Sequence, residues 1–146
     1  MPEACAVAGK PEQRLQAAAE AAKLGYRIAF HLDPVFHYEG WQQDYEELFT
    51  ALHRFAKADI AFFSLGLFRF MPDLGKTIRL RFPYHPILTG EFFMDRDGKY
   101  HYFRAIRKEM YRRFRNWLAP WVDSVPIFWS MEPDPRLLKN DAPSEG

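Results

Sequence analysis

The stretch GYRIAFHLDPVFHYEGW, residues 25–41, constrains the fold of this chain more than any other stretch. An apolar segment at residues 26–30 runs directly into the polar sequence HLDP and then into a Tyr-Glu-Gly-Trp loop. Its shortness and its β-forming side chains predict a strand over residues 26–32, which Asp33-Pro34 ends. Polar groups just past the carboxyl end of a buried strand are where α/β folds build ligand sites.

The remaining pattern alternates helices with strands. A second buried strand is expected at residues 60–65, a hairpin with an Asp-Gly turn at 87–103 and a last strand at 125–130. Because helices separate the strands, we expect an α/β fold: a partial (β/α) barrel of parallel strands with crossover helices, plus a β-hairpin near the carboxyl-terminal end. With 146 residues, the chain is too short for a complete eight-unit barrel. Helices are expected at residues 11–24, 41–57, 72–82 and 104–118.

Chemistry-bearing residues follow the first strand, in a loop that should share one rim with residues 66–71. His31, Asp33, His37 and Glu39 could suggest a metal site, but their spacing is not a standard ligand pattern. A better functional interpretation is recognition of a polar small molecule, with Asp33 accepting hydrogen bonds from hydroxyls or an amine. The structural alternative is that Asp33-Pro34 is only a turn and His31 a core histidine.

Arg69 lies in the GLFRF sequence, where the second strand ends. A guanidinium at that rim could bind a carboxylate or a phosphate. It could equally form a structural ion pair with Asp33 or Glu39 across the rim. The sequence favours neither interpretation.

The formal net charge of +1 conceals a strongly basic middle third. Residues 76–115 hold 11 basic and 4 acidic residues, a net charge of +7, and each flanking region has a net charge of −3. Arg96 and Lys99 at the hairpin turn could enter a nucleic-acid groove, or the turn could be of type I′ and kept soluble by its charges. The cations of the following helix, Arg107 and Arg112 among them, could contact phosphate or form a solvated face.

Aromatic residues make up 17% of the chain, and 14 of them are phenylalanine. They could form a phenylalanine-rich core or offer surfaces on which bases stack. Most of the phenylalanines fall inside apolar runs, which favours the core.

Cys5 is the single cysteine. A single cysteine cannot form a disulfide framework, a four-cysteine zinc site or a self-contained iron–sulfur site, so the sequence excludes all three. No apolar run approaches the roughly 18 residues of a membrane span, and the start lacks the order of a signal peptide. We therefore expect a protein of the reducing cytoplasm with no membrane contact.

Several longer sequences resemble one family, the spore photoproduct lyase family of radical S-adenosylmethionine DNA-repair enzymes. They are GYRIAFHLDP, YEGW followed by DYEELF, SLGLFRF, the RFP-to-GEF passage and IRKEMYRRF, and they occur in the family's order over residues 9–132. The resemblance implies a partial barrel that binds S-adenosylmethionine at the strand carboxyl ends. It also implies cleavage of that cofactor on a [4Fe–4S] cluster, to start reversal of a thymine dimer in DNA.

The resemblance carries over to a few residues. Asp33 and Pro34 match the strand end that touches the cofactor, and Arg96 matches the hairpin tip that enters the lesion. We assign Lys99 and Arg112 to nucleic-acid contact beside it. Asp33 replaces the small residue of the characterised branch, which indicates a divergent relative. The C-x3-C-x2-C motif and the hydrogen-donor cysteine are absent, so we expect no cluster or other metal on this chain and assign no catalytic residue.

By resemblance, the chain divides into a frayed start at residues 1–10, the carboxyl-terminal part of a radical-SAM-like barrel at 11–132 and a polar tail at 133–146. Three functions are then compatible with the sequence. The chain could be an enzyme part, active only with an upstream polypeptide that carries the cluster motif. It could be a nucleic-acid-binding remnant, or a nonfunctional fragment of a broken gene.

Overall fold

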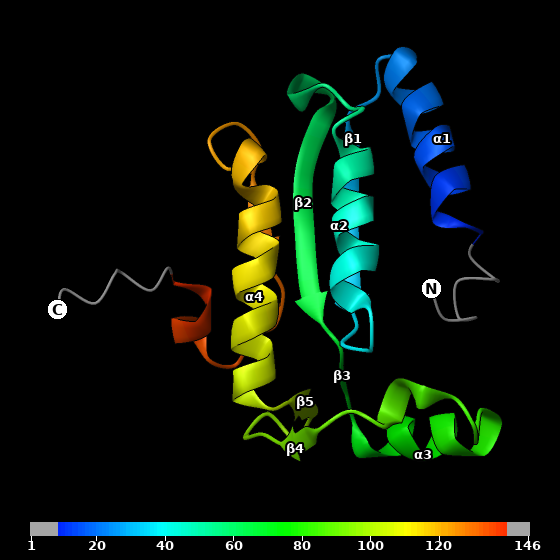
Figure 1. Ribbon diagram of the computed structural model, residues 1–146, viewed down its shortest axis with the longest axis vertical. Coiled ribbons are helices and arrows are strands. Elements are labelled where there is room, and N and C mark those ends of the chain that lie inside the picture. The colour runs from blue at the N-terminus through cyan, green and yellow to red at the C-terminus, as the bar shows by residue number, and fades with distance from the viewer. Residues whose placement is uncertain (1–8, 140–146) are drawn as a thin grey trace, which may run out of the picture.

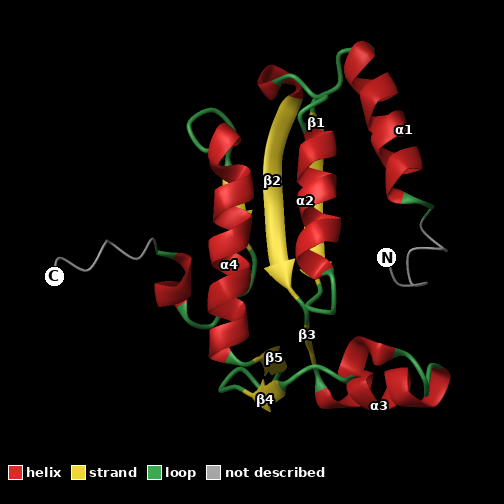
Figure 2. Cartoon of the chain, in the orientation of Figure 1, coloured by secondary structure: helices red, strands yellow, loops and turns green. Residues whose placement is uncertain are grey.

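The computed structural model describes residues 9–139. They form an α/β fold in which helices and strands alternate along most of the chain (Figures 1 and 2). The helices are α1 (Pro11–Lys23), α2 (Trp41–Leu52), α3 (Pro72–Arg81) and α4 (Arg104–Leu118), and the strands are β1 (Ile28–Val35), β2 (Ile60–Leu67), β3 (Arg69–Phe70), β4 (Phe92–Met94), β5 (Tyr100–Tyr102) and β6 (Ile127–Trp129).

The larger sheet is parallel and has the strand order β1-β2-β6. Phe30 pairs with Phe63, and Ser64 pairs with Phe128, in adjacent strands. Helices α2 and α4 cover one face of this sheet (Figure 1). Within residues 9–139 the sheet does not close, so the expected partial barrel is present as an open three-stranded layer.

The core between the helices and the sheet is largely aromatic, as the apolar runs predict. The Phe114 ring lies 5.3 Å from the ring of Tyr45 and 5.9 Å from that of Phe49, both in edge-on contact. Such contacts stabilise a core beyond the apolar area that they bury. The fully buried large side chains include Trp41, Trp121, Tyr102, Tyr111, Phe63 and Phe114.

Strand β1 is longer than expected, because Asp33-Pro34 does not end it. The strand continues to Val35, and its register with β2 shifts between Leu32 and Val35. Pro34 lacks an amide hydrogen, and it is tolerated here because it lies at this irregularity in an edge strand. The extension brings the Asp33 side chain into the sheet's rim rather than into a free turn.

The small sheet is antiparallel, with the order β3-β5-β4, and contains the hairpin. Its arms are shorter than expected, because residues 86–88 form a 3-10 helix instead of a strand. The turn is not of type I′, which would need positive φ at both Arg96 and Asp97. Only Gly98 has positive φ, 75°, and its amide donates to the Asp95 carbonyl at 3.0 Å. This is the longer hairpin connection, which ends in a left-handed glycine.

The expected division of the chain at residues 10 and 132 stays a prediction, because its outer parts are described only in part. Residues 1–8, including Cys5, and residues 140–146 lie outside the described part of the chain. Residues 135–138 of the expected tail form a 3-10 helix, and its Leu137 side chain is buried in the core. No helix in the described chain has the length and apolar character needed to cross a membrane.

Candidate functional site

The carboxyl ends of β1 and β2 meet at an ion pair between Asp33 and Arg69. The Arg69 Nη1 atom donates to Asp33 Oδ1 at 3.1 Å and to the Leu67 carbonyl at 3.0 Å, and Nη2 donates to Asp33 Oδ2 at 3.4 Å. The Asp33 side chain is 29% exposed and the Arg69 side chain 15%. Of the two roles expected for Arg69, the structure therefore contains the ion pair with Asp33. The pair compensates the charge of the Asp33 carboxylate and leaves it accessible to solvent.

Gly66 makes room for the Asp33 carboxylate. A Cβ atom at Gly66 would lie 2.6 Å from Asp33 Cγ and Oδ2, far inside van der Waals contact. The sequence suggested Gly66 only as the end of a strand, yet it lies inside β2. The missing side chain is what lets a carboxylate occupy this point of the rim.

Behind the rim lies a buried polar cluster around Glu132, and the exposed Met131, two residues after β6, connects it to Arg69. Met131 has a φ of 55°, and its sulfur accepts from Arg69 Nη2 at 3.1 Å. The next side chain, Glu132, is 1% exposed and accepts from Arg107 Nη1 at 2.6 Å and from the Tyr111 hydroxyl at 2.7 Å. Burial, with the charge of Glu132, raises the pKa of Tyr111 well above its usual range, so its hydroxyl remains a donor.

Arg107 connects this cluster to the hairpin. Its side chain is 3% exposed, its Nη2 atom lies 4.0 Å from Asp95 Oδ2, and its guanidinium carbon lies 5.5 Å from the Phe93 ring centroid. The sequence interpretation grouped Arg107 with the surface cations of the helix. A signal was present, since residue 107 precedes Met110 and Phe114 at helical spacing on the buried face.

The hairpin turn presents Arg96 and turns its carboxylates elsewhere. Arg96 is exposed, and its backbone amide donates to Asp95 Oδ1 at 2.7 Å. Asp97 Oδ2 lies 2.9 Å from His101 Nε2, and its Oδ1 accepts from the Lys99 amide at 3.1 Å. Burial opposes the ionisation of Asp97, but these hydrogen bonds outweigh it and lower its pKa. The turn's acidic residues are therefore engaged locally, and Arg96 is left at the tip.

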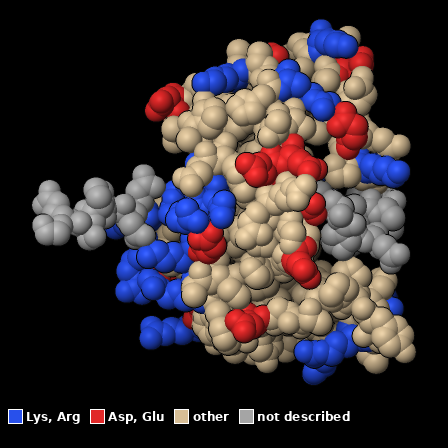
Figure 3. All heavy atoms as spheres, viewed as in Figure 1, with Lys and Arg blue, Asp and Glu red and all other residues tan. Residues whose placement is uncertain are grey.

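Arg112 lies on the exposed side of α4, in contact with Glu109. Its Nη2 and Nε atoms donate to the Glu109 carboxylate at 2.7 and 2.9 Å, and Arg113 adds a contact at 3.1 Å. The hydrogen bond from Arg112 lowers the pKa of Glu109. One ionised carboxylate thus compensates part of the charge on this face, where lysines and arginines gather in Figure 3.

The four residues that could have suggested a metal site do not converge. His31 is exposed and lies edge-on to the Phe62 ring at 5.2 Å, so it is not a core histidine. His37 packs against Trp41 and Tyr102, and burial lowers its pKa. In the part of the chain that is described, no three histidine, cysteine, aspartate or glutamate side chains cluster as metal ligands would.

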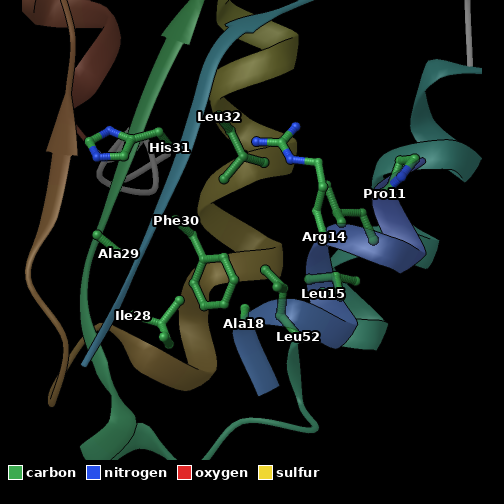
Figure 4. A pocket seen from close by; sticks show the side chains of 11 residues that line it. Pro11, Arg14, Leu15, Ala18, Ile28, Ala29, Phe30, His31, Leu32 and Leu52 are labelled. Atoms are coloured by element: carbon green, nitrogen blue, oxygen red, sulfur yellow. The ribbon is translucent and has the colours of Figure 1, made fainter. Parts of the chain in front are cut away.

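A pocket of about 260 Å³ lies between α1 and β1 (Figure 4), and Asp33 is not among the residues that line it. Phe30 and Leu32 of β1 line it together with Leu15 of α1, whereas His31 points to the other side of the strand. Among the described residues that line it, Arg14 carries the one formal charge. The lining is mostly apolar, so this pocket adds no chemistry to the rim.

In a comparison with known protein families, residues 5–123 match the family described as Spore photoproduct lyase. The chain belongs to the spore photoproduct lyase family. The spore photoproduct lyase of Geobacillus sp. (strain Y412MC61) is 29% identical over 126 residues, which cover 80% of this chain. That of Bacillus subtilis (strain 168) is 33% identical over 76 residues, 49% of this chain and 22% of the relative.

Solved lyase structures share the fold of this chain. A cysteine-to-alanine variant superposes with a TM-score of 0.68 at 27% identity, over 82% of this chain and 38% of the variant. A double variant with bound AdoMet and dinucleoside spore photoproduct gives 0.62 at 26% identity, over 80% of this chain and 37% of that one. The chain spans 37% of the length of the Geobacillus relative, so it corresponds to part of a family member.

Proposed function

We propose that this chain acts as the carboxyl-terminal part of a spore photoproduct lyase-like DNA-repair protein. In this role the rim at Asp33 and Pro34 contributes to binding S-adenosylmethionine, and the Arg96 hairpin contacts a thymine-dimer lesion. One observation carries the proposal: in a member of this family, a chain of contacts runs from the Asp33 rim to the hairpin turn. Arg69 contacts both Asp33 and Met131, and the adjacent Glu132 pairs with Arg107, which approaches Asp95 of the turn. Cofactor and lesion sites that must cooperate need such a rigid connection.

The rim fits part of the cofactor. Asp33 has a carboxylate 29% exposed, which can accept from the hydroxyls or the amine of S-adenosylmethionine. The adjacent Pro34 is exposed as well and offers an apolar surface. A family member solved with bound AdoMet supports cofactor binding as part of the proposed function.

The iron–sulfur cluster does not fit this chain. Three cysteine ligands are needed, and Cys5 is the only cysteine in the sequence. Radical formation from S-adenosylmethionine needs an electron from such a cluster, so this chain alone cannot start the reaction. We therefore include a second polypeptide segment with the cluster motif in the proposal, and we place both in the reducing cytoplasm.

The nucleic-acid surface belongs to this chain itself. Arg96 is exposed at the hairpin tip, Lys99 lies on the same turn, and Arg112 extends the basic surface along α4. A tip residue enters a duplex only where stacking is already weakened, whereas helix cations contact phosphates at any sequence. A family member solved in complex with dinucleoside spore photoproduct supports lesion binding as part of the proposed function.

A fluorescence titration of the whole chain with intact and mismatched duplexes, at two salt concentrations, tests the nucleic-acid role. We expect weak, steeply salt-dependent binding that is tighter for the mismatched duplex. Arg96→Ala should remove that preference, and Arg112→Ala should weaken both duplexes about equally. Equal and salt-insensitive signals, or no binding at low salt, would contradict the proposal.

A nucleic-acid-binding remnant is the second candidate. It is favoured by one observation: the basic residues lie on this chain, whereas the cluster ligands do not. A remnant would keep the duplex preference but would bind no S-adenosylmethionine even beside a cluster-bearing partner. A nonfunctional fragment would show neither property.

A further inference from the structure

The segment at residues 79–84, which ends α3, carries an unusual surface. Leu80 is 83% exposed, Phe82 59% and Tyr84 97%. Arg79 and Arg81 alternate with them, and both are exposed. Large exposed side chains grouped in this way mark a surface that meets another molecule.

The other side of α3 anchors this segment to the protein. Gly75 lies so close to Phe70 that a Cβ atom there would be 2.9 Å from its ring, and Ile78 packs against the core. The Phe82 amide donates to the Ile78 carbonyl at 2.8 Å, and the His85 amide donates to the Phe82 carbonyl at 3.1 Å. The backbone is therefore held in place, and the rings of Phe82 and Tyr84 are presented outward.

The segment lies at the same end of the molecule as the hairpin. In Figure 1, β2 points toward this end, with α3 on one side and β4 and β5 on the other. Figure 3 shows basic residues over α3 and, on the opposite side, along α4. A nucleic acid whose lesion reached the Asp33 rim would therefore pass between the basic residues of α3 and those of α4.

We infer that residues 79–84 form a second nucleic-acid contact, on which an unpaired or unstacked base lies against Tyr84 or Phe82 while Arg79 and Arg81 contact the adjacent phosphates. The inference deepens the proposed function and rests on it. Rings beside cations are how proteins hold single strands without sequence preference. Protein interfaces are enriched in the same aromatic and arginine side chains, so a protein partner is the alternative that the titration must separate. Residues 79–90 contain no acidic residue, and within residues 9–139 neither Arg79 nor Arg81 has a carboxylate partner.

The test is a titration of the whole chain with a short labelled oligothymidine and with an intact duplex of equal length. Tyr84→Ala should weaken single-strand binding about fivefold or more, because one stacked base is lost. Tyr84→Phe keeps the ring and should retain the affinity. Arg81→Ala should reduce the salt slope by about 0.7 on single strands.

Leu80→Ala is the matched control, because Leu80 is as exposed as the rings but cannot stack. It should leave oligothymidine binding unchanged, and unfolding curves should show that Tyr84→Ala keeps the fold. Unchanged single-strand affinity in Tyr84→Ala would overturn the inference. So would self-association that both Leu80→Ala and Tyr84→Ala abolish, with no effect on oligothymidine, because the segment would then be a protein contact.

Arg96→Ala separates this inference from the proposed function. Loss of the preference for mismatched duplex in Arg96→Ala, with Tyr84→Ala at full single-strand affinity, would sustain the hairpin proposal and overturn the second contact. An effect of Tyr84→Ala with none of Arg96→Ala would sustain the second contact and remove the lesion role of the hairpin. No binding of either nucleic acid at low salt would overturn both.

Discussion

At the scale of single residues, the Asp33 carboxylate occupies the space that a side chain at position 66 would need. Gly66→Ala would place a methyl group 2.6 Å from the Asp33 carboxyl group. We expect this variant to lose about 1–3 kcal/mol of unfolding free energy, the usual cost of overpacking. Denaturant unfolding of a double-mutant cycle measures the effect: Gly66→Ala should cost much less in an Asp33→Ala background. An equal cost in both backgrounds would show that Asp33 is not the cause.

The buried pair of Arg107 and Glu132 should be the most costly ion pair to break. Their side chains are 3% and 1% exposed, so Arg107→Met leaves an uncompensated carboxylate in the interior. We expect a loss of about 3–5 kcal/mol in unfolding free energy. Arg54→Ala, at an exposed pair with Glu12, is the control and should cost far less, because water screens an exposed ion pair. Similar losses of unfolding free energy in the two variants would contradict the expected difference between a buried and an exposed ion pair.

Single residues also show how far the sequence predicts the site. Asp33 was placed at the rim correctly, because the carboxyl ends of parallel strands converge. The sequence left open whether Arg69 binds an anionic ligand or forms an ion pair within the protein. The answer depends on distances between side chains, which the spacing of residues along the chain does not determine. Gly66 and Glu132 were missed, because their roles arise from contacts between segments far apart in the chain.

At the scale of elements, the hairpin turn should respond to acid through Asp97. Hydrogen bonds from His101 and the Lys99 amide outweigh the effect of burial and hold the pKa of Asp97 below its ordinary 3.8. A lowered folded-state pKa means that the stabilisation is present above the unfolded-state value and is lost as the pH falls through the folded one. The chemical shift of the Lys99 amide should therefore titrate with a midpoint below 3.8, and Asp97→Asn should abolish the transition. A midpoint above 3.8 would contradict this geometry.

Elements were predicted best where the sequence pattern is long. Residues 104–118 were expected as a helix and form α4 with those bounds, because its apolar stripe repeats over several turns. Strand β1 runs past Asp33-Pro34, and the hairpin arms are shorter than the apolar runs suggest. Such ends depend on which neighbouring strand supplies hydrogen bonds, and local sequence does not specify this.

At the scale of the whole molecule, the parallel sheet has two open edges. In the described part of the chain, β1 and β6 each pair with β2 alone, and Phe128 of β6 is 56% exposed. Open edges and exposed rings promote association, so we expect the chain to self-associate in light scattering. Phe128→Ser should reduce this, whereas Val122→Ser, at a similarly exposed position outside the sheet, should not. A monomer with one sharp unfolding transition would contradict this expectation, because it would show that the open sheet is stable without a partner.

The fold class followed from the alternation of helices and strands, but the extent of the barrel did not. Sequence periodicity indicates parallel strands joined by crossovers, and the β1-β2-β6 sheet confirms this. A strand pattern does not determine whether a sheet closes, since closure depends on strands outside the matched part of the fold. The chain covers 37% of the Geobacillus relative and 38% of the solved cysteine-to-alanine variant, which is consistent with an open layer.

The central proposal, that the Asp33 rim contributes to binding S-adenosylmethionine together with a cluster-bearing segment, is tested most directly by calorimetric titration of the cofactor after anaerobic reconstitution. The chain alone should load no four-iron cluster and bind no cofactor detectably. The same chain fused behind the part of the Geobacillus lyase that it does not cover should bind the cofactor, and Asp33→Ala should weaken that binding. Micromolar affinity in the chain alone, lost in Asp33→Ala, would contradict the account, as would an iron-loaded fusion that binds none.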